Sequence, residues 1–131
     1  MFLADFHCRI ALSSLFYAFA LGAWGTVGFL MARGVSGNYF GALAIGELLM
    51  LVQGALGVIL VLTGNWPADW VHLLYGVLAV SVWPFVYVST QAAVSRREMG
   101  YYALASFFIF GLAVRAIMTG PGADGASCLP H

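Results

Sequence analysis

The sequence predicts an all-α membrane protein in which four transmembrane helices form an up-down-up-down bundle. Its 131 residues are 63% hydrophobic and only 8% charged, whereas about a quarter of the residues in a soluble globular domain are charged. Four segments each carry the roughly 20 apolar residues that a helix needs to cross a bilayer. The segments between them are short, and short connections place consecutive helices antiparallel and side by side.

The four helices are expected to follow one another along a single domain over residues 1–119. Each interruption contains turn-forming residues, such as Gly34, Gly64 and Ser95, which favour loops. The glycine-rich segment 120–131 is expected to be a flexible tail. The predicted helices cover residues 8–33, 40–63, 70–90 and 99–119.

Charge predicts how the bundle is oriented and which partners it lacks. The formal net charge is zero, which argues against binding to nucleic acid. Arginines in short loops are retained on the cytoplasmic side of a membrane, and Arg33, Arg96 and Arg97 all fall at one end of the predicted bundle. Both termini are therefore expected on the outer, periplasmic side, most simply of a bacterial inner or plasma membrane.

The two cysteines, Cys8 and Cys128, are both expected on this outer side. An oxidising compartment would allow a disulfide between them. Alternatively, Cys8 is a small buried hydrophobic residue. The sequence leaves both alternatives open.

Two histidines are expected at the same outer depth of the membrane. His7 lies at the start of the first helix and His72 near the start of the third, and alternate helices of the bundle run in the same direction. Two imidazoles on facing helices can hold a haem iron, and Arg9 and Arg115 at the same end would pair with its propionates. Alternatively, the histidines are interfacial residues whose polar tips reach the headgroup region.

Polar and small residues inside the second helix are further candidates. Glu47 is deep enough to raise a functional hypothesis. Its role is either that of a proton relay or quinone contact, or that of a neutral carboxyl bonded to a hydroxyl such as that of Ser106 or to a backbone carbonyl. Gln53 lies near the middle of the membrane, where an amide often joins helices. Gly54 and Gly57 allow either a neighbouring helix or a flat macrocycle to approach closely.

A longer pattern over roughly residues 6–80 resembles one half of the haem A synthase family. The residues that carry it are 51–57 (LVQGALG), a turn with Pro67, and 71–76 (VHLLYG). The resemblance implies a four-helix bundle in which His7 and His72 are the axial ligands of a single b-type haem. It also implies that the Gln-Gly stretch containing Gln53, Gly54 and Gly57 belongs to the haem site.

The pattern departs from that family next to the first histidine. The family has a glutamate three residues before this histidine and an arginine directly after it, whereas Ala4 and Cys8 occupy those positions here. The family enzyme also contains two such halves. These differences favour a haem-binding relative over a complete synthase.

The leading hypothesis is therefore a membrane-bound b-type haem protein that transfers electrons within or beside a larger respiratory or photosynthetic complex. Its expected partners are the lipid bilayer, other membrane subunits, and a quinone or cytochrome as redox partner. One alternative is a cofactor-free accessory subunit of a membrane complex. Another is a haem A synthase-like half-enzyme that acts as a homodimer.

Overall fold

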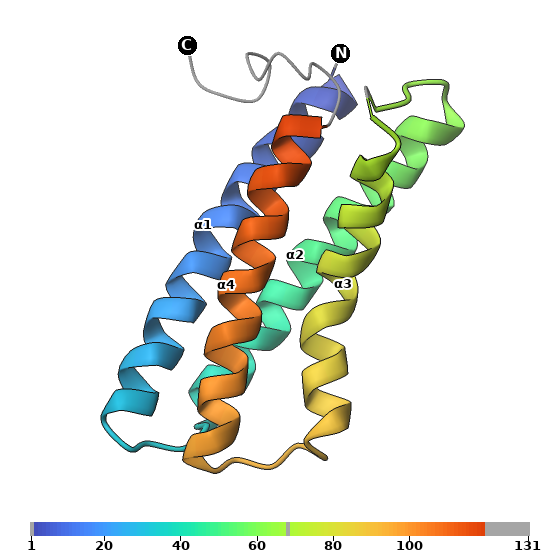
Figure 1. The fold of residues 1–131 in the computed structure, drawn as a ribbon. Coiled ribbons are helices and arrows are strands. Elements are labelled where there is room, and N and C mark those ends of the chain that lie inside the picture. The colour runs from blue at the N-terminus through green and yellow to red at the C-terminus, as the bar shows by residue number, and fades with distance from the viewer. Residues whose placement is uncertain (1, 68, 120–131) are drawn as a thin grey trace.

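The chain folds into a four-helix bundle, which a computed structural model describes for residues 2–67 and 69–119 (Figure 1). Consecutive helices run in opposite directions, so the predicted up-down-up-down bundle is confirmed. All four helices are long and apolar enough to span a membrane, which makes the chain an integral membrane protein. The helices are α1 (Phe2–Leu30), α2 (Gly37–Leu62), α3 (Val71–Ser89) and α4 (Arg96–Thr119).

Three helices begin earlier than their apolar runs predict. α4 begins at Arg96 rather than at residue 99, where the Glu98 carboxylate accepts a hydrogen bond from the backbone N–H of Ser95 (3.1 Å). α1 begins at Phe2 rather than at residue 8, and an ion pair between Arg9 and Asp5 (3.2 Å) lies along its first turns. α2 begins at Gly37 rather than at residue 40, because the Ser36 side chain accepts a hydrogen bond from the backbone N–H of Tyr39 (3.1 Å). Such caps and pairs extend a helix beyond the part that hydrophobicity reveals.

The expected tail and disulfide concern residues outside the described part of the chain. Residues 120–131, which include Cys128, are not among the described residues. Cys8 is buried on α1. The flexible tail and the Cys8–Cys128 disulfide therefore stay predictions.

The tightest helix pair in the bundle is α1 with α4. Three glycines of α1 lie along this contact, at Gly22, Gly25 and Gly28. A Cβ at Gly25 would lie 2.8 Å from the Tyr39 hydroxyl and 2.9 Å from the Cβ of Ala103. Small residues let membrane helices approach this closely, so helix packing, rather than a cofactor, accounts for this glycine stripe.

By contrast, α3 is attached to the rest of the bundle through few buried groups. Trp83 is its one buried residue, and the indole Nε1–H donates a hydrogen bond to the Ser106 hydroxyl of α4 (3.0 Å). The α2–α3 contact is the smallest among neighbouring helices. Much of the apolar surface of α3 therefore faces the surroundings of the bundle, including Val77 and Phe85, which are 65% and 70% exposed.

The two loops at the arginine end of the bundle are joined to each other. The backbone N–H of Val35, between α1 and α2, donates to the carbonyl of Val94, between α3 and α4 (2.8 Å). Arg96 donates to the carbonyl of Phe29 (2.6 Å), and its guanidinium lies 4.3 Å from the centre of the Phe29 ring. These contacts hold the start of α4 against the end of α1.

This junction predicts that Gly34→Ala lowers the stability of the bundle. A Cβ at Gly34 would collide with the carbonyl oxygen of Val94, a backbone atom that cannot move away without displacing the loop. We expect the free energy of unfolding in mild detergent to fall by about 1–3 kcal/mol. Gly41→Ala is the matched control, because a Cβ there meets nothing within 4 Å; an equal loss in both variants would contradict the prediction.

Candidate functional site

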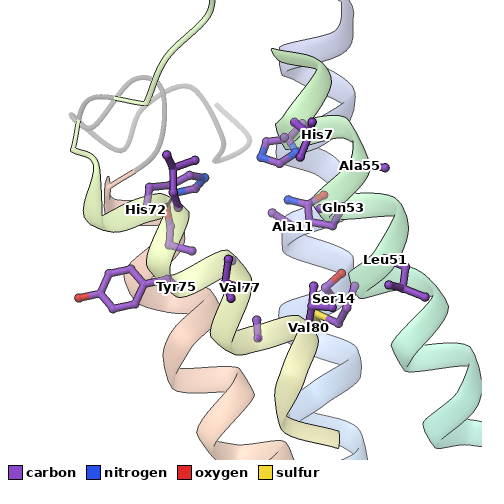
Figure 2. Close-up of a pocket in the computed structure, with 18 of the residues that line it drawn as sticks. His7, Ala11, Ser14, Leu51, Gln53, Ala55, His72, Tyr75, Val77 and Val80 are labelled. Atoms are coloured by element: carbon purple, nitrogen blue, oxygen red, sulfur yellow. Dashed lines mark hydrogen bonds between the residues drawn. The ribbon is translucent and has the colours of Figure 1, made fainter. Parts of the chain in front are cut away.

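A cavity of about 600 Å³ lies in the half of the bundle away from the arginine loops (Figure 2). Residues of all four helices line it, most of them from α2 and α3. The volume falls within the roughly 300–1,000 Å³ typical of cofactor and ligand sites. The lining is largely apolar, and among the described residues no Asp, Glu, Lys or Arg belongs to it.

His7 of α1 and His72 of α3 meet at one end of this pocket. Their ring centroids are 6.1 Å apart, and the ring planes are inclined by 67°. Figure 2 shows the two imidazoles on opposite sides of the pocket at a similar height. The structure therefore brings together the two histidines that sequence reasoning singled out.

The orientation of His72 is set by a hydrogen bond to α4. Its Nδ1 lies 2.8 Å from the backbone carbonyl oxygen of Ala116, which can only accept, so the Nδ1–H donates. In a neutral imidazole this arrangement places the lone pair on Nε2. Histidines that bind metals are commonly held in this way by a carbonyl behind the ring.

His7 is held by packing against α2. The residue is 9% exposed, and a Cβ at Gly57 would lie 3.3 Å from its Cε1 atom. Glycine at this position thus leaves room for the ring. Gly54 lies one turn away and also lines the pocket, although a Cβ there would meet only Val80 of α3, at 3.6 Å.

Three buried polar atoms of the pocket have no hydrogen-bond partner among the described residues. They are Nδ1 of His7, Oγ of Ser14 and Oε1 of Gln53. More than nine in ten buried polar groups in proteins are hydrogen-bonded to protein or to ordered water. Three unsatisfied atoms in one pocket therefore indicate that a polar ligand, or water, belongs there.

The predicted propionate partners lie outside the pocket. Arg9 is exposed and paired with Asp5, and Arg115 is exposed on α4. Neither residue lines the cavity, although both lie in the half of the bundle that contains it. Their role toward a cofactor stays a prediction.

Glu47 lies on α2 one turn from the pocket residue Met50, toward the arginine end of the bundle, and does not line the pocket. Its Oε2 atom is buried without a hydrogen-bond partner among the described residues. The hydroxyl expected for it, that of Ser106, instead accepts the hydrogen bond from Trp83. The suggested Glu47–Ser106 bond is therefore wrong: Oε2 of Glu47 has no partner among the described residues, and Ser106 lies beside Trp83 of α3.

Sequence reasoning missed two polar contributors to the site. Ser14 follows His7 by seven residues, and residues spaced by four and then three lie on one helix face; this spacing could have identified it. No sequence pattern could have identified the carbonyl of Ala116, because every residue has a backbone carbonyl.

The described residues contain no group of three or more His, Cys, Asp or Glu side chains that could hold a metal ion. A pair of imidazoles is nevertheless a complete protein ligand set for an iron whose other ligands come from a macrocycle. Comparison with protein-family models, curated proteins and solved structures finds no match to this chain. The resemblance to one half of the haem A synthase family therefore rests on the residues given above.

Proposed function

We propose that this protein binds one b-type haem through His7 and His72 and transfers electrons within or beside a larger respiratory or photosynthetic membrane complex. The observation that carries the proposal is the 6.1 Å between the two ring centroids. A metal–imidazole bond is about 2 Å long, so two imidazoles on opposite faces of one metal have centroids roughly 6 Å apart.

Other features of the pocket support the same ligand. Its volume and uncharged lining suit a large apolar macrocycle, and Gly57 gives the His7 ring space beside α2. The bond from His72 Nδ1–H to Ala116 supports Nε2 of a neutral imidazole as the atom that would bind the iron. A bound haem would supply a one-electron change at its iron. The protein's part is to hold the two imidazoles and exclude water.

Charge supports a site near the outer face of the membrane. The pocket lies opposite the loops that carry Arg33, Arg96 and Arg97, and such arginines mark the cytoplasmic side. We therefore propose that both termini face the periplasm of a bacterial inner membrane. The exposed Arg9 and Arg115 remain the candidates to pair with propionates that leave the pocket at that side.

The test is a reduced-minus-oxidised absorption spectrum and a pyridine haemochrome assay of the purified protein. We expect a b-type spectrum from the wild type, and its loss in both His7→Ala and His72→Ala. His131→Ala is the matched control, since it removes the third histidine of the chain and should retain the spectrum.

Circular dichroism of the same samples separates loss of ligand from loss of fold. Helical variants without haem would support the two histidines as ligands. A well-folded wild type that takes up no haem, even when haem is supplied during expression, would overturn the proposal.

The exposure of α3 favours a second candidate, a cofactor-free accessory subunit. Only Trp83 of this helix is buried, so most of its surface is available to a neighbouring membrane protein. This candidate predicts copurification with a larger complex that is unaffected by His7→Ala and His72→Ala. Loss of haem in those variants would instead favour the first.

A further inference from the structure

The deeper part of the pocket, which is the part farther from His7 and His72, contains polar groups that would stay without partners if only these two histidines bound a ligand. Ser14 is 2% exposed and its hydroxyl has no hydrogen-bond partner among the described residues, as is also true of Oε1 of Gln53. Ser14 follows His7 by seven residues, which corresponds to about 10 Å along α1. Figure 2 shows Gln53 and then Ser14 successively farther from the imidazoles. These two groups add two polar atoms without partners among the described residues, one from α1 and one from α2, to the pocket lining on the side away from the imidazoles.

The groups around this part of the pocket define the chemistry of its ligand. Within residues 2–67 and 69–119 the pocket lining carries no carboxylate, lysine or arginine, so a neutral ligand suits it best. The Gln53 carbonyl accepts a hydrogen bond, while the Ser14 hydroxyl both donates and accepts. A ligand with a hydroxyl or carbonyl oxygen would satisfy both groups.

The pocket is also open to the lipid along the junction of α2 and α3. Leu51, Val58 and Val77 line the cavity and are 49%, 59% and 65% exposed. An apolar tail attached to the ligand could pass between these side chains into the bilayer. Entry from the membrane would therefore not require passage through water.

We infer that the deeper part of the pocket binds the headgroup of a membrane-soluble quinone or quinol. The Gln53 carbonyl accepts a hydrogen bond from a quinol hydroxyl, or the Ser14 hydroxyl donates one to a quinone oxygen. The isoprenoid tail leaves between α2 and α3. This inference rests on the proposed function, because it names the redox partner of the same pocket.

The test is a titration of the full-length protein in lipid nanodiscs with decylubiquinone, followed by quenching of tryptophan fluorescence and corrected with empty nanodiscs. We expect saturable binding to the wild type and about tenfold weaker binding after Ser14→Ala or Gln53→Leu, which each remove one buried hydrogen bond. Ser13→Ala is the matched control, because Ser13 is exposed and should bind as the wild type does.

The haem spectrum of each sample keeps this inference separate from the proposed function. Weakened quinone binding in both pocket variants, with an unchanged haem spectrum in Ser14→Ala and unchanged helix content in both, would support the inference. Failure of the wild type to bind decylubiquinone, or binding that is equal in all variants, would overturn it even where the haem signal is intact. If protein without haem binds decylubiquinone saturably, and this binding depends on Ser14, the quinone site is supported and only the haem proposal is overturned.

Discussion

Gly25→Leu is expected to destabilise the bundle by about 3 kcal/mol or more, because overpacking a close helix contact costs at least 1–3 kcal/mol. A Cβ at this position would already lie 2.8 Å from the Tyr39 hydroxyl and 3.1 Å from the Cα of Ala103. The Ala103 atom belongs to the backbone of α4, so α1 must move away as a whole. The loss should appear as a lower unfolding midpoint when the protein is titrated with SDS from a mild detergent.

A second glycine of the same stripe provides the control for this prediction. A Cβ at Gly28 would approach the terminal methyl of Met99 most closely, at 2.6 Å, and this flexible side chain can turn aside. Gly28→Ala should therefore cost much less than Gly25→Ala. Equal losses in the two alanine variants would show that α4 does not pack against Gly25 as described.

Trp83→Ala is the second substitution with a large expected effect. Truncation of a buried tryptophan typically costs about 3–5 kcal/mol. Trp83 is 3% exposed and is the one buried residue of α3. We expect α3 to separate from α4 and the pocket beside it to lose its shape. Unfolding followed by far-ultraviolet circular dichroism measures the first effect, and haem content measures the second.

Two further tryptophan variants separate packing from hydrogen bonding. Trp83→Phe keeps an aromatic ring but leaves the Ser106 hydroxyl without its donor, and should cost about 1–3 kcal/mol. Trp70→Ala changes a side chain that is 72% exposed and should alter stability little. A Trp83→Ala variant as stable as Trp70→Ala would refute the proposed role of Trp83 in holding α3.

The fold was predictable because the bilayer permits few alternatives. Backbone groups in lipid must be satisfied within the chain, so four long apolar segments with short connections must form helices. The bounds were less predictable, since the first turns of α1 and α2 depend on polar contacts of Asp5 and Ser36 that hydrophobicity does not register. The partner of Ser106 also depended on the rotation of α3, which no local sequence pattern sets.

The candidate site was predictable only in part. Helix direction places His7 and His72 at one depth, and this is why the sequence identified the pair. Whether two residues at one depth face each other depends on how each helix is rotated about its axis, and this rotation is set by packing such as that of Gly25 against Ala103. The carbonyl of Ala116 became recognisable only once that rotation was known, whereas the spacing of Ser14 from His7 already places both on one face of α1.

The junction of the two arginine-end loops has a consequence for how a large ligand is loaded. Val35 is bonded to Val94 and Arg96 to Phe29 at that end, whereas farther along the bundle α3 is bonded to α4 and has its smallest contact with α2. The least costly way to widen the pocket is therefore to separate α3 from α2, with the α1–α4 and α3–α4 pairs left intact. Such a motion would bend the bundle at its arginine end and open it at the end that carries His7 and His72, so that a ligand could be loaded without unfolding the helices.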